Sequence, residues 1–215
     1  MSRAHLGIAL GGGGARGAAH IGVLQGLQKH KIKINIISGV SAGSVIGAMY
    51  AINEDAEWVE RQYRKVLHKY ISFTEKIRHT DFSPESDSNL SKIKHFIYKN
   101  FLQIIRLYRN SIISKDLLKK LISELITVKT FEELKIPLKV CVADLNSRKK
   151  IIYETGDLIE PLVKSCSIPG VIEPTVEGKR ILVDGGIISP IPVLVLKNSA
   201  DFIVAVNISQ NQYPY

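Results

Sequence analysis

The stretch Gly39-Val40-Ser41-Ala42-Gly43 decides the fold class of this 215-residue chain. It follows an apolar, β-branched run, Ile34 to Ile37, which predicts a strand, and it leads into Ala42 to Ile52, which predicts a buried helix. A serine on a sharp strand-to-helix turn projects its hydroxyl into a cleft, and glycines two residues before and after it remove Cβ atoms that would clash. The pattern is therefore typical of a nucleophilic serine, although a Ser/Gly-rich turn that merely caps a helix would share it.

Strands and helices alternate on both sides of this turn. Further strands are expected over His5–Leu10, Pro137–Leu145, Lys150–Glu154, Arg180–Val183 and Phe202–Val206. Further helices are expected over Ala15–His30, Glu54–Tyr70, Ser91–Ile113, Lys115–Ile126, Asp157–Ser165 and, briefly, Val193–Leu196. This alternation favours an α/β fold with a largely parallel sheet. No repeat or long linker divides the chain, so one domain is expected over residues 1–215.

A glycine-rich stretch, Gly11-Gly12-Gly13-Gly14-Ala15-Arg16-Gly17, follows the first predicted strand. It lacks the Gly-Lys-Ser/Thr ending of a P-loop. Gly12, Gly14 and Gly17 match a dinucleotide fingerprint, but the acidic residue expected about 20 positions later is missing from Lys33 to Ser38. Consecutive small residues leave backbone N–H groups free to converge on an anionic oxygen, so an oxyanion hole is the third interpretation. A plain tight loop would not need four successive glycines, which cost conformational entropy.

The positions of the histidines narrow the choice of a base for the serine. Asp184-Gly185-Gly186 follows an apolar strand, and the carboxyl end of a strand is where α/β folds place ligands. The last of the six histidines is His95, so a Ser–Asp–His order with Asp184 as the acid is excluded. An earlier histidine has no positional support, and His20 fits a packed structural histidine better than a base. A carboxylate acting directly on the serine remains, because burial can raise its pKa.

These three stretches, in this order, resemble the patatin-like phospholipase family. The match consists of Gly12-Gly13-Gly14-Ala15-Arg16-Gly17, Gly39-Val40-Ser41-Ala42-Gly43 and Asp184-Gly185-Gly186. Ser165-Cys166-Ser167-Ile168-Pro169-Gly170 is also similar to the stretch that precedes the aspartate in bacterial members. The resemblance covers about Leu6 to Val206. It implies one patatin-like domain with a modified α/β-hydrolase fold: a three-layer sandwich with a mostly parallel central sheet flanked by helices.

The resemblance also implies an activity and the residues that carry it. The expected enzyme is a Ser–Asp dyad acyl hydrolase acting on phospholipids, lysophospholipids or related acyl esters. Ser41 would be the nucleophile, Asp184 the proton acceptor, and Gly12, Gly13 and Gly14 the oxyanion donors. The residues that would support these motifs are Arg16, Gly17, Gly39, Gly43, Gly185 and Gly186. The alternative is a catalytically idle lipid- or nucleotide-binding module that keeps the glycine-rich loop.

Two further expectations follow from what the sequence does not contain. No His/Asp cluster has the spacing of metal ligands, so neither a metal nor another cofactor is expected. Family members often continue beyond the point where this chain stops, so a C-terminal portion could be missing.

Composition and charge restrict the partners. Hydrophobic residues make up 45% and charged residues 23%, which excludes wholesale disorder, and two cysteines exclude a disulfide-dense or Cys-rich zinc fold. The net charge of +9 favours anionic partners. No nucleic-acid-binding module is recognised, so no nucleic-acid partner is expected. Neither a signal peptide nor a convincing membrane span is found, and a cytoplasmic protein is expected.

The predicted helix Ser91–Ile113 is the candidate for peripheral membrane contact. Lys92, Lys99 and Arg106 fall on one face at 100° per residue, and the opposite face is apolar. Such a basic amphipathic helix can lie on an anionic membrane. A helix whose apolar face packs on the core would have the same pattern, so both interpretations stay open.

Overall fold

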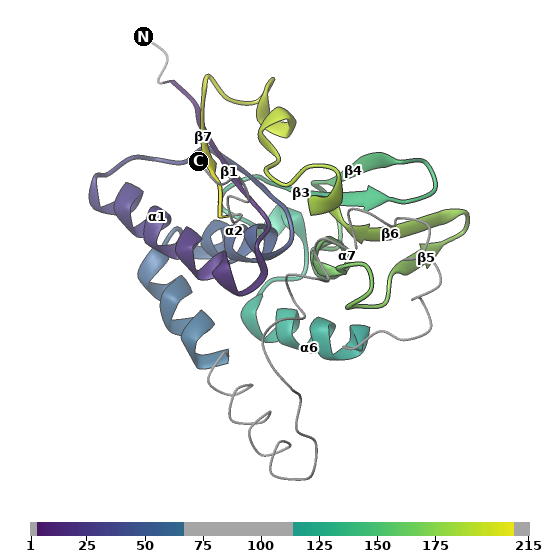
Figure 1. Ribbon diagram of the computed structural model, residues 1–215. Coiled ribbons are helices and arrows are strands. Elements are labelled where there is room, and N and C mark those ends of the chain that lie inside the picture. The colour runs from purple at the N-terminus through teal and green to yellow at the C-terminus, as the bar shows by residue number, and fades with distance from the viewer. Residues whose placement is uncertain (1–3, 67–113, 209–215) are drawn as a thin grey trace, which may run out of the picture.

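A mixed sheet of seven strands forms the centre of the molecule in the computed structural model, which describes residues 4–66 and 114–208 (Figure 1). The strands are β1 (Leu6–Leu10), β2 (Ile36–Gly39), β3 (Leu138–Asp144), β4 (Lys149–Tyr153), β5 (Thr175–Glu177), β6 (Arg180–Asp184) and β7 (Phe202–Val206). Their order is β5-β6-β3-β2-β1-β7, and β4 pairs with β3 off this path.

The sheet has a parallel half and an antiparallel half. Strands β3, β2, β1 and β7 pair in parallel, as expected from the alternation of strands and helices. Strands β4 and β6 are antiparallel to β3, and β5 is antiparallel to β6. The expected α/β class is therefore confirmed, while the short strand β5 was not predicted and parallel pairing is limited to one half of the sheet.

Strand β3 brings the carboxyl ends of two other strands together. Val140 pairs with Gly39 of β2 and, on its other edge, with Tyr153 of β4. Val142 pairs with Asp184 of β6, and its other partner also lies on β4. Strands β2 and β6 therefore share one edge of β3. Because β2 is parallel to β3 and β6 is antiparallel to it, their carboxyl ends meet head to head beside the middle of β3.

Helices cover one face of the sheet. They are α1 (Ala18–Lys29), α2 (Ala42–Asn53), a helix that includes residues 56–66, α6 (Lys115–Leu125) and α7 (Ile159–Cys166). The main core lies between these helices and alternate strand residues such as Ile8, Leu10, Ile37 and Val140. Helix α2 is buried along almost its whole length, as expected from a sequence that is apolar on nearly all sides. Short 3-10 turns, η1 (Gly14–Gly17) and η3 (Phe131–Glu133), lead into α1 and β3.

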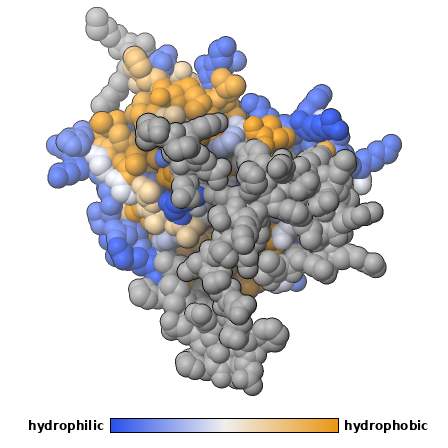
Figure 2. Space-filling view, in the orientation of Figure 1, coloured by the Kyte–Doolittle hydropathy of each residue, from blue (hydrophilic) through white to orange (hydrophobic). Residues whose placement is uncertain are grey.

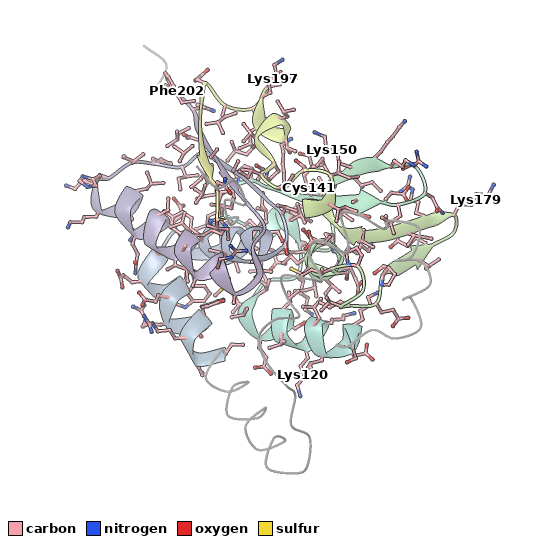
Figure 3. The ribbon with its side chains drawn as sticks, viewed as in Figure 1. Lys120, Cys141, Lys150, Lys179, Lys197 and Phe202 are labelled. Atoms are coloured by element: carbon pink, nitrogen blue, oxygen red, sulfur yellow. The ribbon has the colours of Figure 1, made fainter. Side chains whose placement is uncertain are left out.

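The opposite face has a thinner cover. Ala9 of β1 and Ile36 of β2 point to this side and pack against Leu196 of the 3-10 helix η5 (Val193–Leu196). Figure 2 shows a hydrophobic area at the top of the molecule, in the part where Figure 3 labels Phe202. Phe202 on β7 and Leu194 on η5 are 65% and 73% exposed. The described residues therefore leave apolar surface open beside β7, which is an edge strand of the sheet.

Some expectations lie outside the described residues. These include the amphipathic helix Ser91–Ile113, with its basic residues Lys92, Lys99 and Arg106, and part of the helix expected over Glu54–Tyr70. Among the residues that are described, no helix is both long enough and apolar enough to span a membrane.

Candidate active site

Ser41 occupies the turn between β2 and α2, directly before the first residue of the helix. Its backbone adopts φ 53° and ψ −130°, which is a strained conformation for a residue with a side chain. Only 5% of the residue is exposed. The surrounding structure must therefore hold this conformation in place, as is common at catalytic positions.

Hydrogen bonds fix both polar backbone groups of Ser41. Its N–H donates to Oγ of Ser165 on α7 at 2.9 Å. Its carbonyl oxygen accepts from Ser44, whose Oγ donates at 2.7 Å and whose backbone N–H donates at 2.9 Å. Since the contacts come from α2 and α7, the turn is secured from two directions.

The two glycines of the turn are required by close backbone approach. A Cβ atom added at Gly39 would lie 2.5 Å from Cα of Ser44, and one added at Gly43 would lie 2.3 Å from the carbonyl oxygen of Leu10. Real Cβ atoms do not approach backbone atoms so closely. The spacing of glycines around the serine therefore reflects packing of α2 against the ends of β1 and β2.

Replacing Gly43 with alanine is expected to destabilise the fold by about 3 kcal/mol or more, because the backbone of β1 or α2 must move. Gly22→Ala is the matched control, since Gly22 is an exposed glycine in α1 with nothing within 4 Å of an added Cβ. The control should gain about 0.5–1 kcal/mol from helix propensity. Urea unfolding of both variants measures the contrast. Equal stability of Gly43→Ala and wild type would contradict the packing of this turn.

Asp184 ends β6 and lies at the point where β6 meets β2. It is 6% exposed, its N–H donates to the carbonyl oxygen of Ser167 at 2.9 Å, and its Oδ1 accepts from Gly186 N–H at 2.7 Å. Burial raises the pKa of the Asp184 carboxyl to about 6, although hydrogen bonds from the Ser41 hydroxyl and from Gly186 lower it in part. The Ser41 hydroxyl therefore lies near enough to Asp184 to lower the pKa of its carboxyl, while burial leaves the carboxylate a stronger base than an exposed aspartate.

The raised pKa predicts how stability changes with pH in Asp184→Asn. The Asp184 carboxyl has a pKa of about 6 in the folded protein and about 3.8 in the unfolded chain, so the folded protein binds this proton more tightly. Wild type therefore loses folding stability as the pH rises from below 4 to above 6. Asparagine does not titrate. The stability of the variant relative to wild type should therefore increase by about 2–3 kcal/mol between pH 3.5 and pH 8, as measured by chemical denaturation.

Asp144→Asn is the control of opposite sign. Burial raises the pKa of Asp144, but hydrogen bonds from Ser147, Ile181 and Asn146 outweigh it and leave the pKa below its usual value. Its stabilising effect is therefore present at high pH and lost as pH falls, and the variant should lose relative stability towards pH 8. If both variants changed in the same direction with pH, the assigned environment of Asp184 would be wrong.

The glycine-rich loop lies beside the serine turn. A Cβ atom added at Gly12 would lie 3.3 Å from Cβ of Ser41. The Gly12 N–H already donates to the carbonyl oxygen of Pro190 at 3.0 Å, which corrects the expectation that Gly12 supplies an oxyanion donor. Among the described residues, no acceptor is found for the N–H groups of Gly13 and Gly14. Two of the three expected donors therefore remain available.

The other motif residues have structural contacts. The Arg16 N–H donates to Gly13 O at 3.2 Å and closes the loop, while a Cβ atom at Gly17 would lie 2.7 Å from Cβ of Ala42. Gly185 lies close to the backbone of β3, because a Cβ atom added at Gly185 would lie 2.4 Å from the carbonyl oxygen of Cys141. Together these glycines allow three backbone segments to converge on one site.

His20 is a packed residue beneath the glycine-rich loop. It is fully buried on α1, and its Nε2 lies 2.8 Å from the carbonyl oxygen of Gly11. Burial lowers its pKa, although the bond to Gly11 raises it in part, and Nδ1 has no partner among the described residues. A neutral ring that donates from Nε2 to Gly11 fits the structural role expected from the sequence.

Two contacts at the site had no assigned role at the level of sequence: the Ser165 side chain on Ser41 and the Pro190 carbonyl on Gly12. In the sequence, the Ser165–Gly170 stretch shows only a similarity to other proteins, and no local pattern distinguishes Pro190. The described residues contain no group of three or more His, Cys, Asp or Glu side chains that could hold a metal ion.

Comparison with known proteins gives a family match over most of the chain. The family model described as patatin-like phospholipase matches residues 8–197. An uncharacterized NTE family protein of Mycobacterium bovis is 29% identical over 209 residues, which are 95% of this chain and 49% of that protein. Neuropathy target esterase sws of Drosophila melanogaster is 29% identical over 94% of this chain and 13% of its own length. The chain thus spans about half of the first relative and a small part of the second.

Among solved structures, VipD from Legionella pneumophila is similar, with a TM-score of 0.48 and 16% sequence identity. The alignment covers 87% of this chain and 46% of that one. A heterodimeric complex of ExoU and SpcU from Pseudomonas aeruginosa aligns over 78% of this chain with a TM-score of 0.40.

Proposed function

The chain belongs to the patatin-like phospholipase family, and we propose that it is a serine hydrolase of fatty-acyl esters in phospholipids or lysophospholipids. In this proposal Ser41 is the nucleophile, Asp184 is the general base and acid, and the N–H groups of Gly13 and Gly14 stabilise the oxyanion. The observation that carries the proposal is that Ser41, on a strained turn after β2, and the buried Asp184, at the end of β6, lie where the carboxyl ends of these two strands meet.

In the acylation half, Asp184 accepts the hydroxyl proton of Ser41 while Oγ attacks the carbonyl carbon of the ester. The carbonyl oxygen becomes an oxyanion, and N–H groups held in place before the reaction stabilise it without reorganisation. Collapse of the tetrahedral intermediate breaks the bond to the alcohol oxygen. Asp184 returns its proton to that oxygen, the lysophospholipid or glycerophosphodiester product leaves, and the acyl group remains on Ser41.

In the deacylation half, the same carboxylate activates water. Asp184 takes a proton from a water molecule, whose oxygen attacks the acyl carbon and forms a second oxyanion in the same place. Cleavage of the Oγ–carbon bond releases the fatty acid, and Asp184 gives its proton back to Ser41. One base serves both halves because the leaving alcohol and the entering water occupy the same side of the carbonyl.

A fluorophosphonate probe tests the proposal directly, because it reacts covalently with an activated serine hydroxyl. Wild type should be labelled on Ser41, as located by peptide mass spectrometry, and the purified chain should release fatty acid from a panel of phospholipids and lysophospholipids. An unlabelled wild-type protein with no hydrolysis of any lipid in the panel would favour the idle binding module instead.

The pKa of Asp184 predicts the pH dependence of the reaction. Since the general base must be ionised, kcat/KM should be flat above pH 7 and fall about tenfold for each pH unit well below 6. The measurement is kcat/KM for a soluble short-chain ester between pH 4.5 and 8.5, with folding checked by circular dichroism at each pH. An acid limb centred near pH 4 would show that the base is an exposed carboxyl rather than Asp184.

A further inference from the structure

We infer that Ser165 is a positioning residue that holds Ser41 in its strained conformation and sets its place relative to Asp184. The inference rests on the proposed function, because it concerns the geometry of the proposed nucleophile and base. Ser165 lies in the last turn of α7, 124 residues after Ser41 in the sequence, and is fully buried.

The Ser165 hydroxyl links the nucleophile to the central strand. It accepts the N–H of Ser41 at 2.9 Å and donates to the carbonyl oxygen of Cys141 at 2.8 Å. A hydroxyl can accept and donate at once, so this one side chain joins two backbone groups that otherwise have no partner in common. Water has little access to a fully buried position, and a substitute without the hydroxyl would leave the Ser41 N–H with no acceptor.

The carbonyl oxygen of Cys141 lies where β2, which leads to Ser41, meets β6, which ends at Asp184. Cys141 comes between Val140, which pairs with β2, and Val142, which pairs with Asp184 of β6. Gly185 approaches the same oxygen so closely that an added Cβ would lie 2.4 Å from it. Figure 3 labels Cys141 on β3, in the middle of the molecule. The hydrogen-bond chain from Ser41 through Ser165 therefore ends beside the turn that carries Asp184.

The end of α7 also contacts the aspartate directly. The backbone carbonyl of Ser167 accepts the N–H of Asp184 at 2.9 Å, two residues after Ser165. The amides of both proposed catalytic residues are thus held by one short segment, Ser41 through a side chain and Asp184 through the backbone. Only the first of these links can be removed by a side-chain substitution, so Ser165 is the position at which the separation of nucleophile and base can be tested.

Loss of this hydroxyl should act on the chemical step. Without the acceptor, the Ser41 peptide can relax from its positive φ, and Oγ of Ser41 spends less time in place for proton transfer to Asp184. A misplacement of about 1 Å at a reacting group can lower the rate by about 100-fold. Ser165→Ala should therefore lower kcat by about 10- to 100-fold, with KM within about twofold of wild type. Ser165→Thr keeps the hydroxyl and should recover most of the lost rate.

Ser38→Ala is the matched control. Ser38 is also a fully buried serine, and its Oγ donates to a distant backbone carbonyl, that of Pro192, at 2.9 Å. It lies on the opposite face of the sheet and has no contact with the Ser41 amide. Ser38→Ala should lose a comparable amount of stability, since both variants lose one buried hydrogen bond, but kcat should stay within about twofold of wild type.

The experiment measures kcat and KM for a soluble short-chain ester and the second-order rate of fluorophosphonate labelling, at a temperature where thermal unfolding shows every variant to be folded. The expected result is slow hydrolysis and slow labelling for Ser165→Ala alone, with its acid-limb pKa unchanged. Equal rates for Ser165→Ala and wild type, or equal losses in Ser165→Ala and Ser38→Ala, would overturn the positioning role. Failure of wild type itself to label would instead reject the proposed function.

Discussion

Ser41→Ala is expected to lower ester hydrolysis by at least about 10⁴-fold, because the variant has no atom that can form the acyl-enzyme. The stability should change by about 1 kcal/mol or less. Alanine retains the Cβ atom, so the positive φ of this position and its hydrogen bonds to Ser165 and Ser44 remain. The test combines the rate of short-chain ester hydrolysis, fluorophosphonate labelling and urea unfolding of the same protein preparation.

Two results would contradict the assignment of the nucleophile. The first is hydrolysis by Ser41→Ala near the wild-type rate. The second is labelling of a different serine in wild type. Three other buried serines lie near Ser41 in the sequence or in the fold, namely Ser38, Ser44 and Ser165. The urea unfolding curve distinguishes an inactive but folded variant, which is the expected result, from a variant that is inactive because it does not fold.

Asp184→Asn is expected to slow hydrolysis by at least about 100-fold, since it keeps the shape of the side chain and removes the general base. Acylation and deacylation should slow together, because the same carboxylate serves both halves. Rapid-quench measurement of acyl-enzyme formation and breakdown separates the two steps. The variant should also be at least as stable as wild type at pH 8, because a buried charge that hydrogen bonds compensate only in part has been removed.

His20→Ala tests the competing base. The ring contacts the Gly11 carbonyl and has a lowered pKa, so its loss should reduce stability and disturb the glycine-rich loop without removing a proton acceptor. Activity of the folded variant should therefore depend on pH as in wild type. A loss equal to or greater than that of Asp184→Asn, at unchanged stability, would instead identify a histidine as the base.

The proposed catalytic residues could be picked out from the sequence because each stands in a short motif of neighbouring residues. Gly39 is required by the sharp turn, where an added Cβ would lie 2.5 Å from Cα of Ser44, and the buried helix after Ser41 is apolar on nearly all sides. The absence of a histidine after Asp184 can be read directly from the order of residues in the chain. The α/β class followed from the alternation of strands and helices, since hydrophobic periodicity is set within each element.

Pairing between distant segments decided the rest. Nothing local in Arg180–Asp184 indicates that β6 runs antiparallel to β3, yet this direction makes its carboxyl end meet that of β2. The Gly12 amide was expected to be free and is occupied by Pro190, a contact between residues far apart in the chain. The link from Ser41 through Ser165 to Cys141 joins three separate elements. Strand direction and long-range hydrogen bonds depend on which surfaces meet when the whole core packs, so only the folded structure reveals them.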